Sequence, residues 1–167
     1  MALHQDLLEQ AKHLAKREPK RPRQASLRRA VSAAYYALFH LLVSEGATRL
    51  APTQPSGLRR QVQRAFVHGQ MKDVCKTFGA GNAPNGIHHL ITLPLQTELK
   101  SISLAFVDLQ EKRHKADYDL TYVPIRLDVL QAVQSAEQAF NDWNTVKKSH
   151  NASVFLASLL LQKHWAK

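Results

Sequence analysis

Apolar residues recur along most of the chain at spacings of three and four, which is the period of an amphipathic helix. The clearest run shares one helical face and consists of Leu27, Val31, Ala34, Leu38, Leu41 and Leu42. No segment shows the alternating, β-branched pattern that is typical of a strand. The pattern therefore predicts an all-α protein, an up-and-down helical bundle of about four or five helices with an additional C-terminal helix.

Proline and glycine mark the expected ends of these helices, because proline excludes preceding residues from helical geometry and glycine favours a helix stop. We expect helices over Gln5–Arg17, from Leu27 to Glu45-Gly46, over about Leu58–Phe78, from about Pro94 onward, and over about Ile125–His150. Residues 79–86 form a loop rich in glycine, and residues 151–167 form the C-terminal helical extension. A length of 167 residues favours a single domain spanning 1–167.

One helical stripe ends in a charge. Its apolar members are Leu95, Leu99, Ile102, Phe106 and Leu109, and the next position is Arg113. A guanidinium on a buried face needs a partner or a bound anion. Two interpretations stay open: an ion pair with Asp117, four residues on, or a phosphate clamp in which His114 moves a proton near neutral pH.

The charge balance favours an anionic partner. The chain has 23 Lys and Arg against 13 Asp and Glu, a formal charge of +10, in a composition typical of a folded protein. Arg59, Arg60 and Arg64 cluster at the start of an expected helix, where the helix dipole disfavours cations and a bound anion would compensate.

Cysteine usage and hydropathy bear on the compartment. The single Cys75 cannot form an internal disulfide and is expected to be a small buried hydrophobe, so a reducing, cytoplasmic environment is predicted. No apolar run approaches the roughly 20 residues that span a bilayer, so no membrane association is expected. His88 and His89 are adjacent and cannot share a face as metal ligands, so neither a metal nor a cofactor is expected.

Two segments carry a family resemblance. The segment from Ser26 to His40, SLRRAVSAAYYALFH, resembles the second helix of HEPN domains (higher eukaryotes and prokaryotes nucleotide-binding). The segment RHKADY, from Arg113 to Tyr118, falls where that family carries its Arg-x(4–6)-His motif. The resemblance spans roughly residues 5 to 148 as a helix pattern. Arg113 matches the motif arginine, and His114 matches the polar residue that usually follows it.

The resemblance implies a bundle that dimerises so that the two arginine motifs face each other across a cleft. Active members are metal-independent ribonucleases, often in toxin or antiphage systems, and others bind nucleotides or pair with a nucleotidyltransferase. This chain departs from the motif, since Tyr118 stands five residues after Arg113, where the histidine could be. A tyrosine with an ordinary pKa of about 10 is a poor base at neutral pH, so cleavage would depend on His114.

Three hypotheses follow. The first is a homodimer that binds RNA or a nucleotide in a basic cleft. Arg113 is its phosphate anchor, and the other candidate binding residues are His114, Asp117, Tyr118, Lys112, Lys115, Arg28, Arg29 and His40. The second is a metal-independent endoribonuclease of toxin or antiphage type, with Arg113 and His114 as catalytic residues. The third is a non-catalytic partner of a nucleotidyltransferase.

Overall fold

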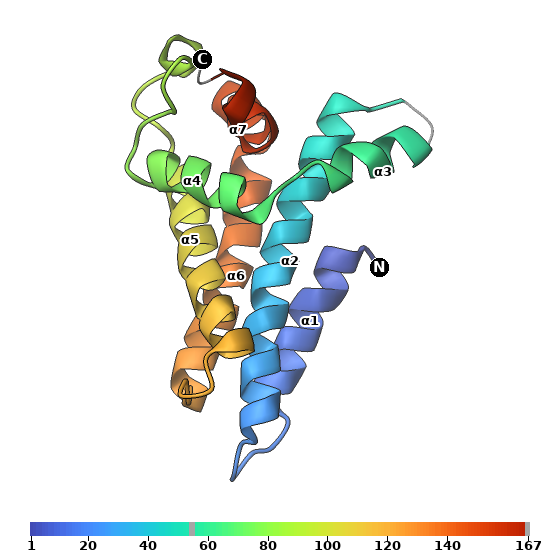
Figure 1. The fold of residues 1–167 in the computed structure, drawn as a ribbon, viewed down its shortest axis with the longest axis vertical. Helices are drawn as coiled ribbons and strands as arrows, with labels where there is room; N and C mark the ends of the chain where they lie inside the picture. Colours follow the sequence, from blue (N-terminus) through green and yellow to red (C-terminus); the bar gives the residue numbers. More distant parts are fainter. Residues whose placement is uncertain (54–55, 166–167) are drawn as a thin grey trace. The chain divides into compact units, whose positions relative to one another are not determined.

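The computed structural model describes residues 1–53 and 56–165, and within these residues all regular secondary structure is helical (Figure 1). The described α-helices are α1 (Leu3–Lys16), α2 (Gln24–Leu50), α3 (Ser56–Arg64), α4 (His68–Gly79), α5 (Thr97–Tyr118), α6 (Arg126–Val146) and α7 (His150–Trp165). A short 3-10 helix, η1, covers His88–Leu90. The prediction of an all-α helical bundle is confirmed, and α7 is the expected C-terminal helix.

The chain divides into two compact units. Unit 1 comprises residues 1–40 and 105–140, and unit 2 comprises residues 41–104 and 141–167. The boundaries between them fall within α2, α5 and α6. That the whole chain forms a single domain stays a prediction.

The core of unit 1 forms where α1, α2 and α5 bury their apolar faces. Small side chains on α1 and α2 let the helices approach closely, and Ala11, Ala30 and Ala34 are fully inaccessible to solvent. Tyr35 of α2 is equally buried, with its ring centroid 5.5 Å from that of Phe106 on α5. These contacts confirm the inward faces predicted for both helices.

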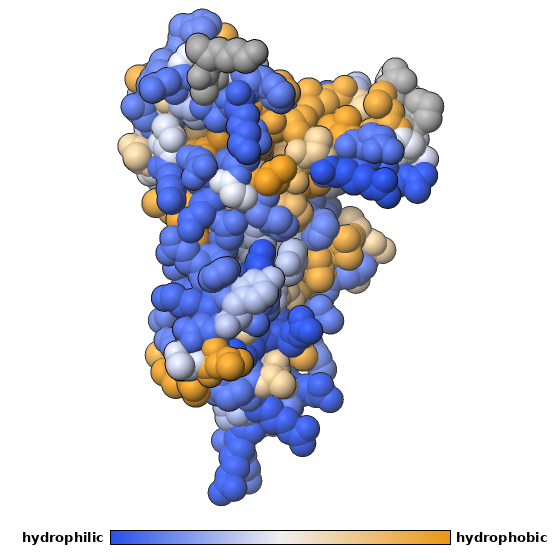
Figure 2. Space-filling model, in the orientation of Figure 1, coloured by the Kyte–Doolittle hydropathy of each residue, from blue (hydrophilic) through white to orange (hydrophobic). Residues whose placement is uncertain are grey.

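Unit 1 also leaves an apolar surface exposed, at the connection between α5 and α6. Figure 2 shows hydrophobic side chains gathered there. These are Tyr118, Leu120, Val123, Ile125 and Leu127, each more than half exposed.

Unit 2 is organised around α4 and α7. The rings of Phe78 and Phe155 meet edge to face at a centroid distance of 5.0 Å, and Cys75 is buried beside them on α4. Burial raises the pKa of the Cys75 thiol, which confirms the prediction of an inert hydrophobe. The buried amide of Asn151, at the start of α7, donates to the carbonyl of Thr92 and accepts from its N–H.

Gly46 does not end a helix, and the predicted stop at this position is wrong. The second helix continues past Gly46 to Leu50, and Gly46 serves its packing instead. A Cβ at this position would lie 2.6 Å from Cζ of Phe66, so only glycine lets the ring lie against the helix.

The single helix predicted over residues 58–78 is also wrong, because the chain turns at Phe66. Val67 is extended, with φ −118° and ψ 126°, and separates α3 from α4. The turn buries the Phe66 side chain, whereas α3 itself contains no buried residue among those described. The fourth predicted helix begins at Thr97 rather than at Pro94 and extends to Tyr118.

None of the helices in the described part of the chain combines the length and hydrophobicity needed to cross a membrane.

Candidate functional site

Arg113 lies in unit 1, beside two neighbouring tyrosine rings. Its side chain is 11% exposed, and its Cζ lies 5.2 Å from the ring centroid of Tyr35 and 5.4 Å from that of Tyr36. Nη1 lies 3.7 Å from Oδ2 of Asp117, and the other carboxylate oxygen, Oδ1, accepts a hydrogen bond from the Ser32 hydroxyl. The ion-pair interpretation of Arg113 and Asp117 is therefore the arrangement present in the fold.

The charge of the Arg113 guanidinium finds its partners within the chain. Two aromatic faces and one carboxylate stabilise its charge, and the ion pair is worth more here than on an exposed helix face, because less water screens it. The buried Nε has no hydrogen-bond partner among the described residues. Part of the Arg113 charge is therefore already balanced within the chain before any phosphate binds.

His114 and Tyr118 lie on the surface of α5. Their rings are 5.1 Å apart, as expected for residues four apart on a helix, and both side chains are exposed. The structure thus separates the predicted cluster into an ion pair, Arg113 and Asp117, whose side chains are 11% and 22% exposed, and an exposed ring pair, His114 and Tyr118.

The two lysines of the predicted cluster differ in their contacts. Lys112 forms an ion pair with Asp108, one turn earlier on α5, at 2.8 Å. Lys115 is exposed and has no hydrogen-bond or ion-pair partner among the described residues. Of these two lysines, only Lys115 therefore has an ammonium group that no described residue pairs with.

Arg28 has a structural role. Its guanidinium donates hydrogen bonds to the backbone carbonyls of Ala116, Asp119, Leu120 and Tyr122, at and just after the end of α5. The last carbonyls of a helix lack partners within the helix and carry the negative end of its dipole, so a cation is favourable at this position.

Three further arginines bind carbonyls in the same way. Arg126 donates to the carbonyls of Glu18 and Pro19 after α1. Arg59 donates to those of Ala51 and Pro52 after α2, and Arg49 donates to that of Lys147 after α6. The expected anion beside Arg59 is thus replaced by backbone oxygens, and part of the excess of positive charge stabilises helix ends.

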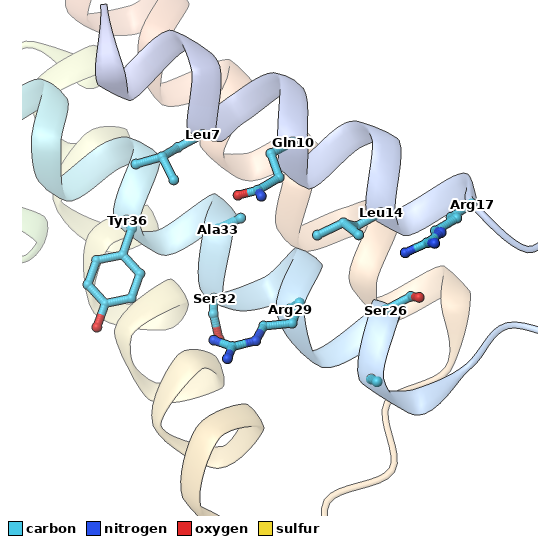
Figure 3. Close-up of a pocket in the computed structure, with 10 residues that line it drawn as sticks. Leu7, Gln10, Leu14, Arg17, Ser26, Arg29, Ser32, Ala33 and Tyr36 are labelled. Atoms are coloured by element: carbon cyan, nitrogen blue, oxygen red, sulfur yellow. The ribbon is translucent and has the colours of Figure 1, made fainter.

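An open groove of about 470 Å³ lies between α1 and α2 in unit 1 (Figure 3). It is called the cationic groove here and is lined by Leu7, Gln10, Leu14, Arg17, Ala25, Ser26, Arg29, Ser32, Ala33 and Tyr36. Arg17 and Arg29 are exposed, and no Asp or Glu among the described residues lines the groove. The groove therefore has a positive potential near its two guanidinium groups.

The two arginines of the groove differ in their partners. Arg29 has no hydrogen-bond or ion-pair partner among the described residues, whereas Nε of Arg17 lies 3.9 Å from the neighbouring carboxylate of Glu18. Desolvation raises the pKa of Glu18, but hydrogen bonds from the Ser26 hydroxyl and the Arg23 N–H outweigh it and lower that pKa. Glu18 therefore stays ionised near neutral pH and offsets part of the Arg17 charge, which leaves Arg29 as the freest cation of the groove.

His40 lies one turn beyond Tyr36 on α2, with 6.3 Å between the two ring centroids. Burial lowers the pKa of His40, and the charge of His4 lowers it further, so the neutral imidazole is favoured in the fold. His40 does not line the cationic groove.

The remaining polar candidates give no metal site. Within the described residues, no group of three or more His, Cys, Asp and Glu side chains is placed to hold an ion. His88 and His89 are exposed on η1, and the His150 imidazole contacts the carbonyl of Leu90.

The binding residues predicted from the sequence include Arg29 of α2 but no groove residue from the α1 side. Leu7, Gln10, Leu14 and Arg17 recur at spacings of three and four, and this stripe was available as a signal. Its polar members, however, are indistinguishable from an ordinary solvated helix face until the neighbouring helix is known.

Comparisons of the chain with family models, curated proteins and solved structures gave no match in any of the three.

Proposed function

We propose that this chain is a HEPN-like protein that binds RNA or a nucleotide as a homodimer, with the cationic groove of unit 1 as the phosphate-binding surface. The observation that carries the proposal is the position of Arg29. Its guanidinium is exposed and has no partner among the described residues, and the described lining of its groove includes a second arginine and no carboxylate. An arginine fork binds phosphate oxygens in a bidentate manner, which suits this class of ligand.

The two ends of the groove differ in their residues, and this difference suggests how a ligand lies in it. Figure 3 shows Arg17 at the end of the groove where α1 and α2 are joined and Leu7 and Tyr36 at the other end, with the Arg29 guanidinium beside Ser32, between the two ends. Arg29 and Tyr36 are seven residues apart, about 10 Å along the helix axis. A phosphate at Arg29 would thus place the attached base toward the Tyr36 ring, on which bases can stack.

Arg113 has a supporting role in this proposal. Its guanidinium contacts the Tyr36 ring and is held by Asp117, so it fixes the aromatic end of the groove from inside the unit. Lys115 and His114 lie on the surface of α5 and are available to a longer RNA, but they do not line the groove.

The test is the affinity of the full chain for a fluorescent single-stranded RNA and for a mononucleotide, measured by anisotropy across a range of salt concentrations. Arg29→Ala should weaken RNA binding about tenfold or more and reduce the magnitude of the salt slope by close to one. Arg21→Ala is the matched control, because it removes an exposed arginine of the same unit that does not line the groove.

Equal affinities of the wild type and Arg29→Ala would overturn the groove as the binding site. Binding of RNA without binding of the mononucleotide would assign the groove to a polynucleotide. Cleavage of the RNA in excess EDTA, lost in His114→Ala, would replace the binding proposal by the ribonuclease alternative. Copurification of a nucleotidyltransferase without any RNA affinity would favour the third hypothesis.

A further inference from the structure

Unit 2 contains a pocket of its own, formed by α4, the loop that follows α4, η1 and α7. Its volume is about 330 Å³, and all of its described lining residues belong to unit 2. It is called the polar pocket here and is lined by Asp73, Val74, Thr77, Asn82, Ala83, Pro84, Asn85, His88 and Gln162. A pocket of this size has room for a small molecule.

Contacts within unit 2 hold the walls of the polar pocket in place. Gln70 of α4 donates a hydrogen bond to the carbonyl of Leu160 on α7, which ties the two helices together. Gly81 turns the chain out of α4 with a φ of +83°, a conformation that favours glycine, and the next N–H, that of Asn82, donates back to the carbonyl of Thr77. Walls that are formed before binding lose little conformational entropy when a ligand enters.

Two acceptor groups of the lining have no partner among the described residues. Oε1 of Gln162 is buried and accepts no hydrogen bond from them, although buried polar atoms nearly always have a partner. The exposed carboxylate of Asp73 forms neither a hydrogen bond nor an ion pair with a described residue. A ligand that fits the polar pocket must therefore supply hydrogen-bond donors.

The charges in and around the polar pocket favour a neutral ligand. No Lys or Arg is among the described lining residues, and the Asp73 carboxylate repels anions. The surroundings disfavour a cation, because Lys72 and Lys76 flank Asp73 on α4 and Lys163 follows Gln162 on α7. Unit 2 as a whole has 11 Lys and Arg against four Asp and Glu. The ligand that fits best is therefore uncharged and rich in hydrogen-bonding groups.

We propose that the polar pocket binds a neutral polyhydroxy compound, a monosaccharide or cyclic polyol, through adjacent hydroxyl groups. A carboxylate has two acceptor oxygens side by side, so Asp73 can accept hydrogen bonds from two neighbouring hydroxyls of one ring. The carboxamides of Asn85 and Gln162 offer both a donor and an acceptor, which matches a hydroxyl group in either role. The buried side chains of Val74 and Ala83 supply apolar surface for the C–H face of the ring.

The test is a titration of the isotope-labelled full chain with glucose, galactose, ribose and myo-inositol in turn, followed by two-dimensional nuclear magnetic resonance. The range extends to about 50 mM, which suits weak ligands. At least one compound should shift the side-chain amide signals of Asn82, Asn85 and Gln162 and reach saturation. Asp73→Ala should weaken this binding about tenfold or more, because hydrogen bonds to a charged group are lost. Glu98→Ala, which removes another carboxylate of unit 2 outside the pocket, should leave it unchanged.

Three results would each overturn the proposal: no saturable shift with any of the four compounds, equal affinities of the wild type and Asp73→Ala, or tighter binding of the polyamine spermidine than of every neutral compound. Salt gives an independent check, because a neutral ligand displaces no counterions and its affinity should not fall steeply as salt rises. The inference does not rest on RNA binding. Arg29→Ala should leave the affinity for the polyhydroxy compound unchanged and Asp73→Ala should leave RNA affinity unchanged, so the two proposals fail separately.

Discussion

Two surfaces of unit 1 are built by neighbouring arginines of the same helix, and they have opposite characters. The Arg28 guanidinium donates hydrogen bonds to four backbone carbonyls at the end of α5 and in the connection between α5 and α6. The exposed side chains of this connection are mostly apolar. Arg29 lines the open groove between α1 and α2, where its guanidinium lies beside Ser32 and has no hydrogen-bond or ion-pair partner among the described residues. Adjacent residues of a helix point about 100° apart. This rotation is enough to give Arg28 a structural role and to leave Arg29 available to a ligand.

The comparison shows that a net charge is a poor guide to the size of an anion-binding surface. Arg28, Arg49, Arg59 and Arg126 all bind carbonyls that follow helix ends, and Arg113 is held by two rings and a carboxylate. These five of the 23 Lys and Arg side chains thus interact with the chain's own groups. A partner can use the exposed cations that have no partner among the described residues, of which Arg29 and Lys115 are examples in unit 1.

The largest effect should come from Arg28→Ala. The substitution leaves several carbonyls of the connection without a donor, so we expect a loss of about 2–4 kcal/mol in the free energy of unfolding. Denaturation by urea, followed by circular dichroism, measures it. Arg28→Lys should recover only part of the loss, because one ammonium group cannot reach carbonyls spread along the connection. A stability equal to that of Arg29→Ala would contradict the assignment of Arg28 to the fold.

The next largest effect on stability should come from Arg113→Ala. Removing the guanidinium leaves Asp117 unpaired and a space beside Tyr35 and Tyr36, with an expected cost of about 1–3 kcal/mol. Arg113→Met restores the volume without the charge and should cost less than Arg113→Ala in the same urea titration. If Arg113→Ala and Arg113→Met lose the same stability, the lost charge accounts for the destabilisation and the packing against the tyrosine rings does not.

A pH dependence should distinguish the connection from the groove. Hydrogen bonds from the Thr121 hydroxyl and N–H lower the pKa of Asp119. A lowered carboxyl pKa contributes stability that is complete above the unfolded value of about 3.9 and is lost as the pH falls through the folded value. Thr121→Val should therefore be less stable than the wild type at pH 6, and the difference should shrink toward pH 3. A difference that is constant with pH would refute this role of Asp119.

The smallest effect on stability should be that of Arg29→Ala. An exposed arginine without a partner contributes within about 0.5 kcal/mol, although the same substitution should weaken RNA binding. Equal urea midpoints for the wild type and this variant, together with a reduced RNA affinity, would sharpen the contrast with Arg28. A clear loss of stability would instead place Arg29 among the structural arginines.

The helical periodicity was sufficient to predict the fold class and the inward faces. Leu99, Ile102, Phe106 and Leu109 are fully buried, as their spacing predicts, and Arg113 follows them on the same stripe of α5. Helix ends were less accurate. Gly46 reads as a stop signal because glycine usually ends helices, but here it accommodates a ring from a residue 20 positions later.

The candidate site was predicted in part. The pairing of Arg113 with Asp117 was one of two interpretations of their spacing, and the structure contains it. The tyrosine rings around Arg113 come from another helix more than 70 residues away, so no local pattern could reveal them. The same holds for Arg28, whose four carbonyl partners lie about 90 residues further along the chain.

By itself, the sequence determined an all-helical chain, a strongly positive charge and an arginine on the inward stripe of α5, because these depend on composition and on a period of 3.6 residues. Only the tertiary structure decided which cations are free. A guanidinium is neutralised by carbonyls, rings and carboxylates brought to it from distant segments, and this depends on which way each side chain turns from its helix. For that reason Arg28 and Arg29, identical and adjacent in sequence, have different surroundings and different expected roles.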